Sequence, residues 1–294
     1  MIPLIEIYCL LDDFCKNFEN ISKEYFLTKL PKKRNRPCRM SLSEIMTILV
    51  MFHMSQYKTF KDFYTSCIME NYRQEFPKLV SYTRFIELMP SAFMPLMVLL
   101  LSLKGRQTGK YYIDSTKLPV CHNLRINRNK VFKNCAQRGK TSTGWFFGFK
   151  LHIVINNQGE IVNFTLTKGN VHDVTIVDNI TQTLKGWLFG DRGYISKALY
   201  ESLKKRGLEL FTTLKSNMKQ KILEPMQKQY LKQRNIVETI IGQLKSIMTI
   251  DHSRHRSIIN FQVNVLGGLL AYVFKPKKAS SSFKHLNLIS LTSN

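Results

Sequence analysis

The sequence has few acidic residues, little glycine and proline, and no closely spaced cysteine pairs. Its 294 residues include 20 Asp and Glu against 44 Lys and Arg, a formal net charge of +24. With 14 Gly, 9 Pro and 44% hydrophobic residues, the chain can build a sizeable core, which excludes wholesale disorder. A positive charge of this size attracts polyanions. Nucleic acid is the leading partner, because neutralised phosphates release counterions.

The cysteine pattern and the apolar stretches indicate a cytoplasmic protein without a membrane partner. The six cysteines form no C-x-x-C pair, so we interpret them as reduced thiols. The N-terminus has no basic segment followed by an apolar one, and we expect no secretion. Two apolar stretches, 85–103 and 258–274, are interrupted by charged, proline or amide residues, and we expect neither to span a bilayer.

Residues 1–104 are expected to be mostly helical. Ser41 and Glu44 form a capping-box pattern ahead of apolar residues at helical spacing, and two further helices are expected at 60–67 and 82–103. The segment 31–39 carries five basic residues and no acid. Short helices beside a basic loop suit a DNA-binding region. An ordinary helical scaffold with a solvated loop is an equally good interpretation.

After a linker at 104–110 the hydrophobic pattern changes from helical to alternating. We expect strands at 111–114, 146–155, 161–167, 187–190 and 208–212, and helices at 171–184, 196–206 and 225–248. Asn and Gly within 156–159 tolerate positive φ, so the second and third strands should form a hairpin. We therefore divide the chain into a helical region (1–104), a second domain (105–275) and a basic, polar C-terminal tail (276–294).

This order of elements predicts an α/β fold. Three strands with a hairpin, followed by alternating helices and strands, are typical of a ribonuclease-H-like domain, with a mixed five-stranded sheet and helices on both faces. Reactive groups gather at the carboxyl ends of strands in such sheets. Asp114 and Asp191 each come where an apolar strand is expected to end. The alternative for each aspartate alone is a turn or cap residue.

Glu238 is the third candidate carboxylate. At 100° per residue, Arg234, Glu238 and Lys245 lie within about 40° of one another on the helix expected at 225–248. Three carboxylates can hold two hard divalent cations, which stabilise the attacking and leaving oxygens of a displacement at phosphorus. The alternative for this helix is a surface salt-bridge triad.

These acids lie in three motifs: YIDST at 112–116, LFGDRGY at 188–194, and Arg234-x3-Glu238-x6-Lys245. With GFKLH at 148–152 and TKGNVHD at 167–173, the motifs resemble DDE transposases of bacterial insertion sequences. The chain is most similar to the nine-eighty-two family, which is related to the insertion-sequence-four group. The resemblance covers about residues 105–275.

The resemblance implies a metal-dependent transposase that cleaves inverted-repeat ends and joins their 3′-hydroxyls to target DNA. Asp114, Asp191 and Glu238 would be the catalytic, metal-binding triad for two Mg²⁺, for which Mn²⁺ can substitute. Arg234 and Lys245 would contact phosphate near the transposon end. The related group has a Tyr three residues before that Arg. Here Tyr230 lies one residue earlier and is expected on the same helix stripe.

Further DNA contacts are expected from basic residues near the acids. Arg192 follows Asp191 directly. The segment 121–144 has no acid and should form a DNA-contacting loop beside the active site, with a merely solvated loop as the alternative. Its predicted contact residues are Arg125, Arg128, Lys130, Lys133, Arg138 and Lys140.

The expected partners are double-stranded DNA, as inverted-repeat ends and target, and a second copy of the chain in a synaptic complex. The expected location is the bacterial cytoplasm, at the nucleoid. Two other functions remain open: a sequence-specific DNA-binding regulator or decayed transposase that does not cut, and a ribonuclease-H-like nuclease or resolvase that cuts without joining.

Overall fold

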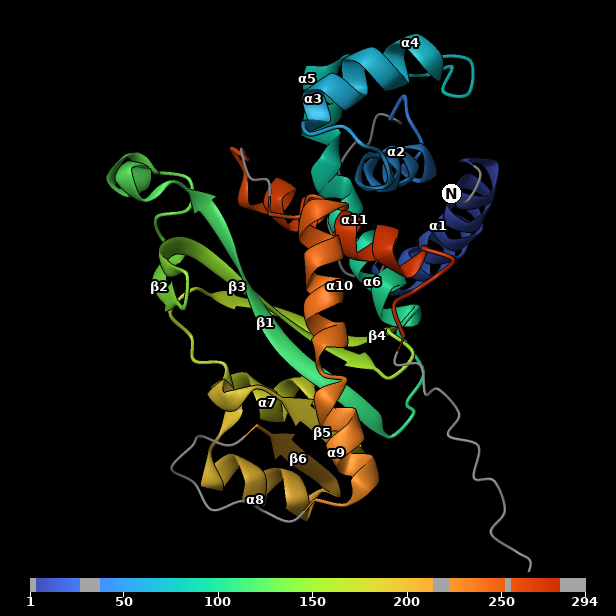
Figure 1. The fold of residues 1–294 in the computed structure, drawn as a ribbon. Helices are drawn as coiled ribbons and strands as arrows, with labels where there is room; N and C mark the ends of the chain where they lie inside the picture. Colours follow the sequence, from blue (N-terminus) through green and yellow to red (C-terminus); the bar gives the residue numbers. More distant parts are fainter. Residues whose placement is uncertain (1–3, 27–37, 214–222, 252–254, 281–294) are drawn as a thin grey trace, which may run out of the picture.

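The computed structural model describes residues 4–26, 38–213, 223–251 and 255–280. The first part of the chain is helical (Figure 1). Its elements are α1 (Leu4–Phe26), α2 (Leu42–Met54), α3 (Phe60–Asp62), the π-helical turn η1 (Phe63–Ile68), α4 (Met69–Asn71), α5 (Tyr82–Leu88), the 3₁₀ turn η2 (Met89–Ala92) and α6 (Phe93–Ser102). Most of the basic segment 31–39, and the tail beyond residue 280, lie outside the described residues.

The capping box predicted from sequence starts α2. The Ser41 N–H donates to Glu44 Oε2 (2.6 Å) and the Glu44 N–H donates to Ser41 Oγ (3.1 Å), so two N-terminal donors of the helix are satisfied. The expected helix at 60–67 is present as α3, η1 and α4. Its middle is a π-helical turn rather than regular α-helix.

The apolar stretch Tyr82–Ser102 passes a test for membrane-spanning length and composition, with a mean hydropathy of 1.8. The same test is met by core helices of soluble proteins. In this chain the stretch is broken by η2 and packs against α11 (Ile258–Val273), and 39% of its most apolar 18-residue window is buried. The expectation of no membrane partner remains a prediction.

A mixed sheet of six strands follows. The strands are β1 (Lys110–Cys121), β2 (Gln137–Thr141), β3 (Gly144–Asn156), β4 (Ile161–Lys168), β5 (Gly186–Gly190) and β6 (Leu208–Thr212). The order is β2-β3-β1-β5-β6, and β4 also pairs with β3. The β1–β3, β2–β3 and β3–β4 pairs are antiparallel, whereas β1–β5 and β5–β6 are parallel. The predicted β3–β4 hairpin is confirmed, and Gly159 takes a φ of +77° in its turn.

Two of the expected elements differ. The sheet has six strands instead of five, because the polar segment of β2 pairs with the first part of β3. The expected long helix at 225–248 is two helices, α9 (Pro225–Lys232) and α10 (Asn235–Ser246). The Ile236 and Val237 N–H groups donate to the carbonyls three residues before them, at Gln233 and Arg234. This tighter turn interrupts the α-helical pattern.

Helices cover both faces of the sheet, as predicted (Figure 1). On one face α7 (Val174–Ile180) and α8 (Lys197–Lys205) enclose a separate core with apolar residues of β1, β5 and β6. On the other face α9 and α10 pack on β1, β5 and β6. The larger core continues from that face through α11 to α2 and α6. The proposed boundary at residues 104/105 remains a prediction, since the core is continuous across it.

Candidate active site

Two of the predicted acids lie on adjacent parallel strands. The β1–β5 pairing places Tyr112 beside Phe189, so that Asp114 lies level with Asp191, the residue that follows the end of β5. The Asp191 carboxylate accepts a hydrogen bond from the Gly193 N–H (2.8 Å) and caps the 3₁₀ turn η4 (Arg192–Tyr194). Both acids therefore lie where the parallel half of the sheet ends.

The expectation that the first strand stops at Asp114 is wrong. β1 runs on for seven residues to Cys121, because its antiparallel pairing with β3 continues after β5 has ended. Pro119 is accommodated at a register shift in this extension. Asp114 is thus in the middle of a strand, but at the end of the parallel pairing.

The third acid approaches from α10, where Arg234 holds it. The guanidinium of Arg234 donates to Glu238 Oε1, and its Nη1 lies 3.9 Å from Asp114 Oδ2. The side chains of Arg234 and Asp114 are 16% and 20% exposed, whereas that of Glu238 is 50% exposed. The Arg234 guanidinium thus lies between Asp114 and Glu238. Of these two acids, Glu238 on the helix is the more exposed.

The electrostatics of Asp114 indicate crowding of like charges. Burial raises its pKa to about 6, and the charges of Asp191 and Glu238 act in the same direction. A hydrogen bond from the Ser115 N–H (2.7 Å) and the charge of Arg234 oppose the rise. Because the charges of Asp191 and Glu238 both raise the pKa of Asp114, the three carboxylates lie close enough to interact electrostatically.

The donor set suits hard divalent cations, which take carboxylate oxygens and reduce such repulsion. The three carboxylates are not arranged as the ligands of one metal site. Among the residues that the structure describes, no three His, Cys, Asp or Glu side chains are arranged to hold a metal. Arg234 occupies the space between Asp114 and Glu238, where it supplies positive charge.

Sequence reasoning missed a buried polar cluster next to the acids. Lys150 on β3 donates to Asp173 Oδ1 and to the Val171 carbonyl, both at 3.0 Å. His152, two residues along the same strand, is 1% exposed, bonds Thr167 Oγ1 (2.9 Å), and has its pKa lowered to about 4 by burial. The period-two spacing of Lys150 and His152 was the available signal, since it places both side chains on one face of the strand.

Tyr194 connects this cluster to the acids. Its ring is 1% exposed. Burial raises the pKa of its hydroxyl well above the usual range, and the charges of Asp114, Asp173 and Asp191 add to the rise. Asp173 is therefore a fourth carboxylate near the site. The phenol ring packs in the core on the face of the sheet that α7 and α8 cover.

Tyr230 is buried, although it was expected on the helix stripe that faces DNA. It is 1% exposed, and its ring stacks on Phe189 with the Lys110 ammonium over its face (4.9 Å). The helix break at 233–234 explains the difference, because α9 turns this residue towards β5. Contact between its ring and DNA would require this packing to open.

The other predicted DNA contacts are at or near the surface. Lys245 lies 3.6 Å from Asp251 and is separated from Glu238 by two helical turns, while Arg192 is exposed beside Asp191. Arg125, Arg128, Lys130, Lys133, Arg138 and Lys140 are all exposed. They do not form a simple loop, because their segment folds into the 3₁₀ turn η3 (Asn123–Arg128) and β2. It begins seven residues beyond Asp114, about 23 Å along an extended strand.

Comparison with known proteins identifies the class. A family profile described as a transposase DDE domain matches residues 104–258, which is more than half of the chain. The chain belongs to the DDE transposase family. All three predicted acids lie inside the matched region.

Two further comparisons add little. Among curated proteins no match was found. Among solved structures, the crystal structure of the Mos1 strand transfer complex matches at 13% identity over 80% of this chain and 84% of that chain. The TM-score of 0.24 is too low for that likeness to support an argument.

Proposed function

We propose that this DDE transposase cleaves the ends of an insertion sequence and joins their 3′-hydroxyls to target DNA, with Asp114, Asp191 and Glu238 as its catalytic acids. The observation that carries the proposal is the grouping of the three carboxylates in the part of the chain that matches the family: Arg234 lies between Asp114 and Glu238, and the charge of Asp191 acts on Asp114. The sheet topology, in which β1 to β4 are joined by antiparallel pairing and β5 and β6 are added in parallel, supports a ribonuclease-H-like catalytic domain. The motif spacing favours the nine-eighty-two family and its insertion-sequence-four relatives.

The acids would bind divalent cations, two Mg²⁺ or Mn²⁺, which activate the attacking hydroxyl and stabilise charge on the leaving oxygen. Asp114 is positioned by β1, and Asp191 by the turn that follows β5. Glu238 is the adjustable acid, because it is half exposed and is held by Arg234. We propose that Arg234 releases Glu238 and turns to a DNA phosphate, for which its planar fork of donors is suited.

The DNA is proposed to follow the exposed basic residues on both sides of the acids. Arg192, which follows Asp191 directly, and Lys245 on α10 would hold the DNA near the acids, and the basic residues of η3 and β2 would hold a more distant part of the duplex. Because two transposon ends must be joined together, the working form would be a homodimer. The site of action would be the bacterial nucleoid.

The test is the Asp191→Asn variant. Asparagine retains the oxygen that accepts the Gly193 N–H, so the local turn is preserved while the charge is removed. Labelled end DNA is incubated with Mg²⁺ and a target plasmid. We expect both cut and joined products to fall about a hundredfold or more, with DNA affinity within about twofold of the parent.

The matched control is Glu201→Gln, an exposed acid on α8, which should leave both products unchanged. Full activity of Asp191→Asn would refute the assignment of this acid. The same assay separates the alternative functions. A regulator or decayed transposase binds without cutting, and a nuclease or resolvase cuts without joining.

A further inference from the structure

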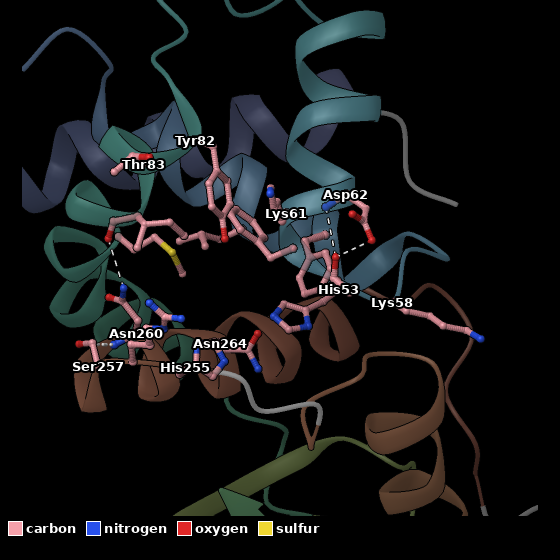
Figure 2. Close-up of a pocket in the computed structure, with 17 residues that line it drawn as sticks. His53, Lys58, Lys61, Asp62, Tyr82, Thr83, His255, Ser257, Asn260 and Asn264 are labelled. Carbon is pink, nitrogen blue, oxygen red and sulfur yellow. Dashed lines mark hydrogen bonds between the residues drawn. The ribbon is translucent and has the colours of Figure 1, made fainter. Parts of the chain in front are cut away.

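Two features of the molecule lie outside the proposed chemistry. One is a cavity of about 730 Å³ between the N-terminal helices and α11 (Figure 2). Apolar surface makes up most of its wall, which favours no single class of ligand. The other is an apolar side chain at the far end of β1: Leu124, in the 3₁₀ turn η3, is 88% exposed, the highest fraction among the large hydrophobic residues that the structure describes. This turn projects from the end of β1 at the upper left of Figure 1.

The turn that carries Leu124 is held to the sheet. The Leu124 N–H donates to His122 Nδ1 (3.4 Å), which caps the turn, and the Asn123 side-chain amide donates to the Trp145 carbonyl on β3 (2.8 Å). Ile126, in the same turn, packs against the larger core. Hydrogen bonds and packing thus fix the turn, while the leucine side chain is left in solvent.

The charged side chains of the segment around Leu124 are all basic. A single exposed leucine is ordinary on a protein surface, so its neighbours decide what it can bind. Arg125 follows it directly and Arg128 ends the same turn, and both are exposed. The next element, β2, adds the exposed Arg138 and Lys140. Duplex DNA carries one negative charge for about every 1.7 Å of its axis, so its backbone complements this segment.

We propose that Leu124 is a wedge that enters between two base pairs of duplex DNA from the minor groove, with Arg125 and Arg128 on the flanking phosphates. Proteins that kink DNA insert leucine and other apolar side chains in this way, and they partly unstack the base step. Because the turn is fixed to the sheet, the leucine can be inserted without first being ordered.

The length of β1 predicts where the DNA is unstacked. This prediction rests on the proposed function, because it takes the DNA at the acids to follow β1. Asp114 and Cys121 are about 23 Å apart along the strand, and the turn adds up to about 6 Å. Base pairs of DNA are about 3.4 Å apart, so the unstacked step should lie about seven to nine base pairs from the phosphate at the acids.

The experiment measures unstacking without cleavage, with the full chain in EDTA. Permanganate oxidises thymines that have lost their stacking. Two duplexes are compared. One is the end DNA of the cleavage assay, with thymine placed in turn about five to eleven base pairs from the cleaved phosphate. The other is an unrelated G·C-rich duplex with one central TA step, the kind of step that is most easily unstacked. When protein is bound, thymines about seven to nine base pairs from the phosphate, and the thymine of the TA step, should react at least about fivefold faster.

Leu124→Ser is the decisive variant. Because the side chain is 88% exposed, its loss should leave the melting temperature unchanged. The enhanced reactivity should nevertheless disappear on both duplexes, whereas Leu124→Met should retain it, since methionine also serves as a wedge. The matched control is Ile5→Ser, an apolar residue of α1 that is 74% exposed, which should leave the reactivity unchanged.

The two arginines should affect binding in another way. Arg125→Met combined with Arg128→Met should weaken binding to both duplexes. It should also reduce the slope of log affinity against log salt by about two, because two phosphate contacts are lost. An unchanged slope would contradict these contacts.

Equal thymine reactivity in the parent and in Leu124→Ser would overturn the inference. So would binding of the parent to anionic phosphatidylglycerol vesicles that Leu124→Ser abolishes, because the leucine would then anchor the protein to a membrane. Failure of the proposed function is distinguishable, because the protein would then unstack the TA step in EDTA yet neither cut nor join DNA in Mg²⁺.

Discussion

Acid should destabilise this protein through His53. The imidazole on α2 is 1% exposed, and its Nδ1–H donates to the Met248 carbonyl. Burial lowers its pKa to about 4, and the nearby His255 acts in the same direction. An unfolded histidine titrates near 6.5. Between these values the unfolded chain binds a proton that the folded protein does not, so stability present above pH 6.5 is lost as the pH falls.

The size of the effect follows from the two pKa values. Between about pH 7.5 and pH 4.5 the free energy of unfolding should fall by about 2–3 kcal/mol on account of His53 alone. This is a large share of the stability of an ordinary domain, about 5–15 kcal/mol.

Urea unfolding at both pH values, for the parent and for His53→Asn, isolates this contribution. The asparagine amide can donate to the Met248 carbonyl but does not titrate. The variant is expected to be less stable at neutral pH, because a buried ring is lost, and to lose about 2–3 kcal/mol less on acidification. Burial also lowers the pKa of His152. Because this residue is present in both the parent and the variant, its contribution cancels in the difference between them. An identical loss in the two proteins would refute the reasoning.

Three other predictions concern packing and reactivity. Gly268→Ala should lower the free energy of unfolding by about 1–3 kcal/mol in urea titrations, because a Cβ there would collide with the Ile250 side chain. Lys150→Met should cost about 1–3 kcal/mol in the same assay, because Asp173 would lose its partner in a site with little solvent. In thiol titration with a disulfide reagent, Cys15 should react only after unfolding, because burial raises the pKa of its thiol to about 12, whereas the exposed cysteines should react at once.

The sequence predicted those helices, strands and turns that are determined by residues close together in the chain. The cap of α2 depends on Ser41 and Glu44, and the β3–β4 hairpin depends on a turn that includes Gly159. β5 and β6 were found because each is a short apolar run between turn residues. In these cases the residues that determine the structure are close together in the chain.

The features that were missed depend on distant partners. β2 is polar and lacks alternation, and it is a strand because β3 pairs with it. β1 passes Asp114 for the same reason, and Tyr230 is buried because the turn after α9 directs it towards β5. Within the site, Asp114 and Asp191 could be expected near one another from strand ends. The position of Arg234 between two acids depends on how α10 lies across the sheet.

The extension of β1 beyond Asp114 sets a spacing between two surfaces of the molecule. The seven steps to Cys121 separate the acids from the basic turn and β2, and each step adds about 3.3 Å. Insertion of two residues here would increase the distance between the acids and the basic segment by about 6.6 Å, and deletion of two would decrease it by the same amount. In both cases the side chains would keep their faces of the sheet. A change of a single residue would invert every side chain that follows. Relatives in which the distance between the acids and the basic DNA-binding segment is different should therefore differ in the length of this strand by an even number of residues.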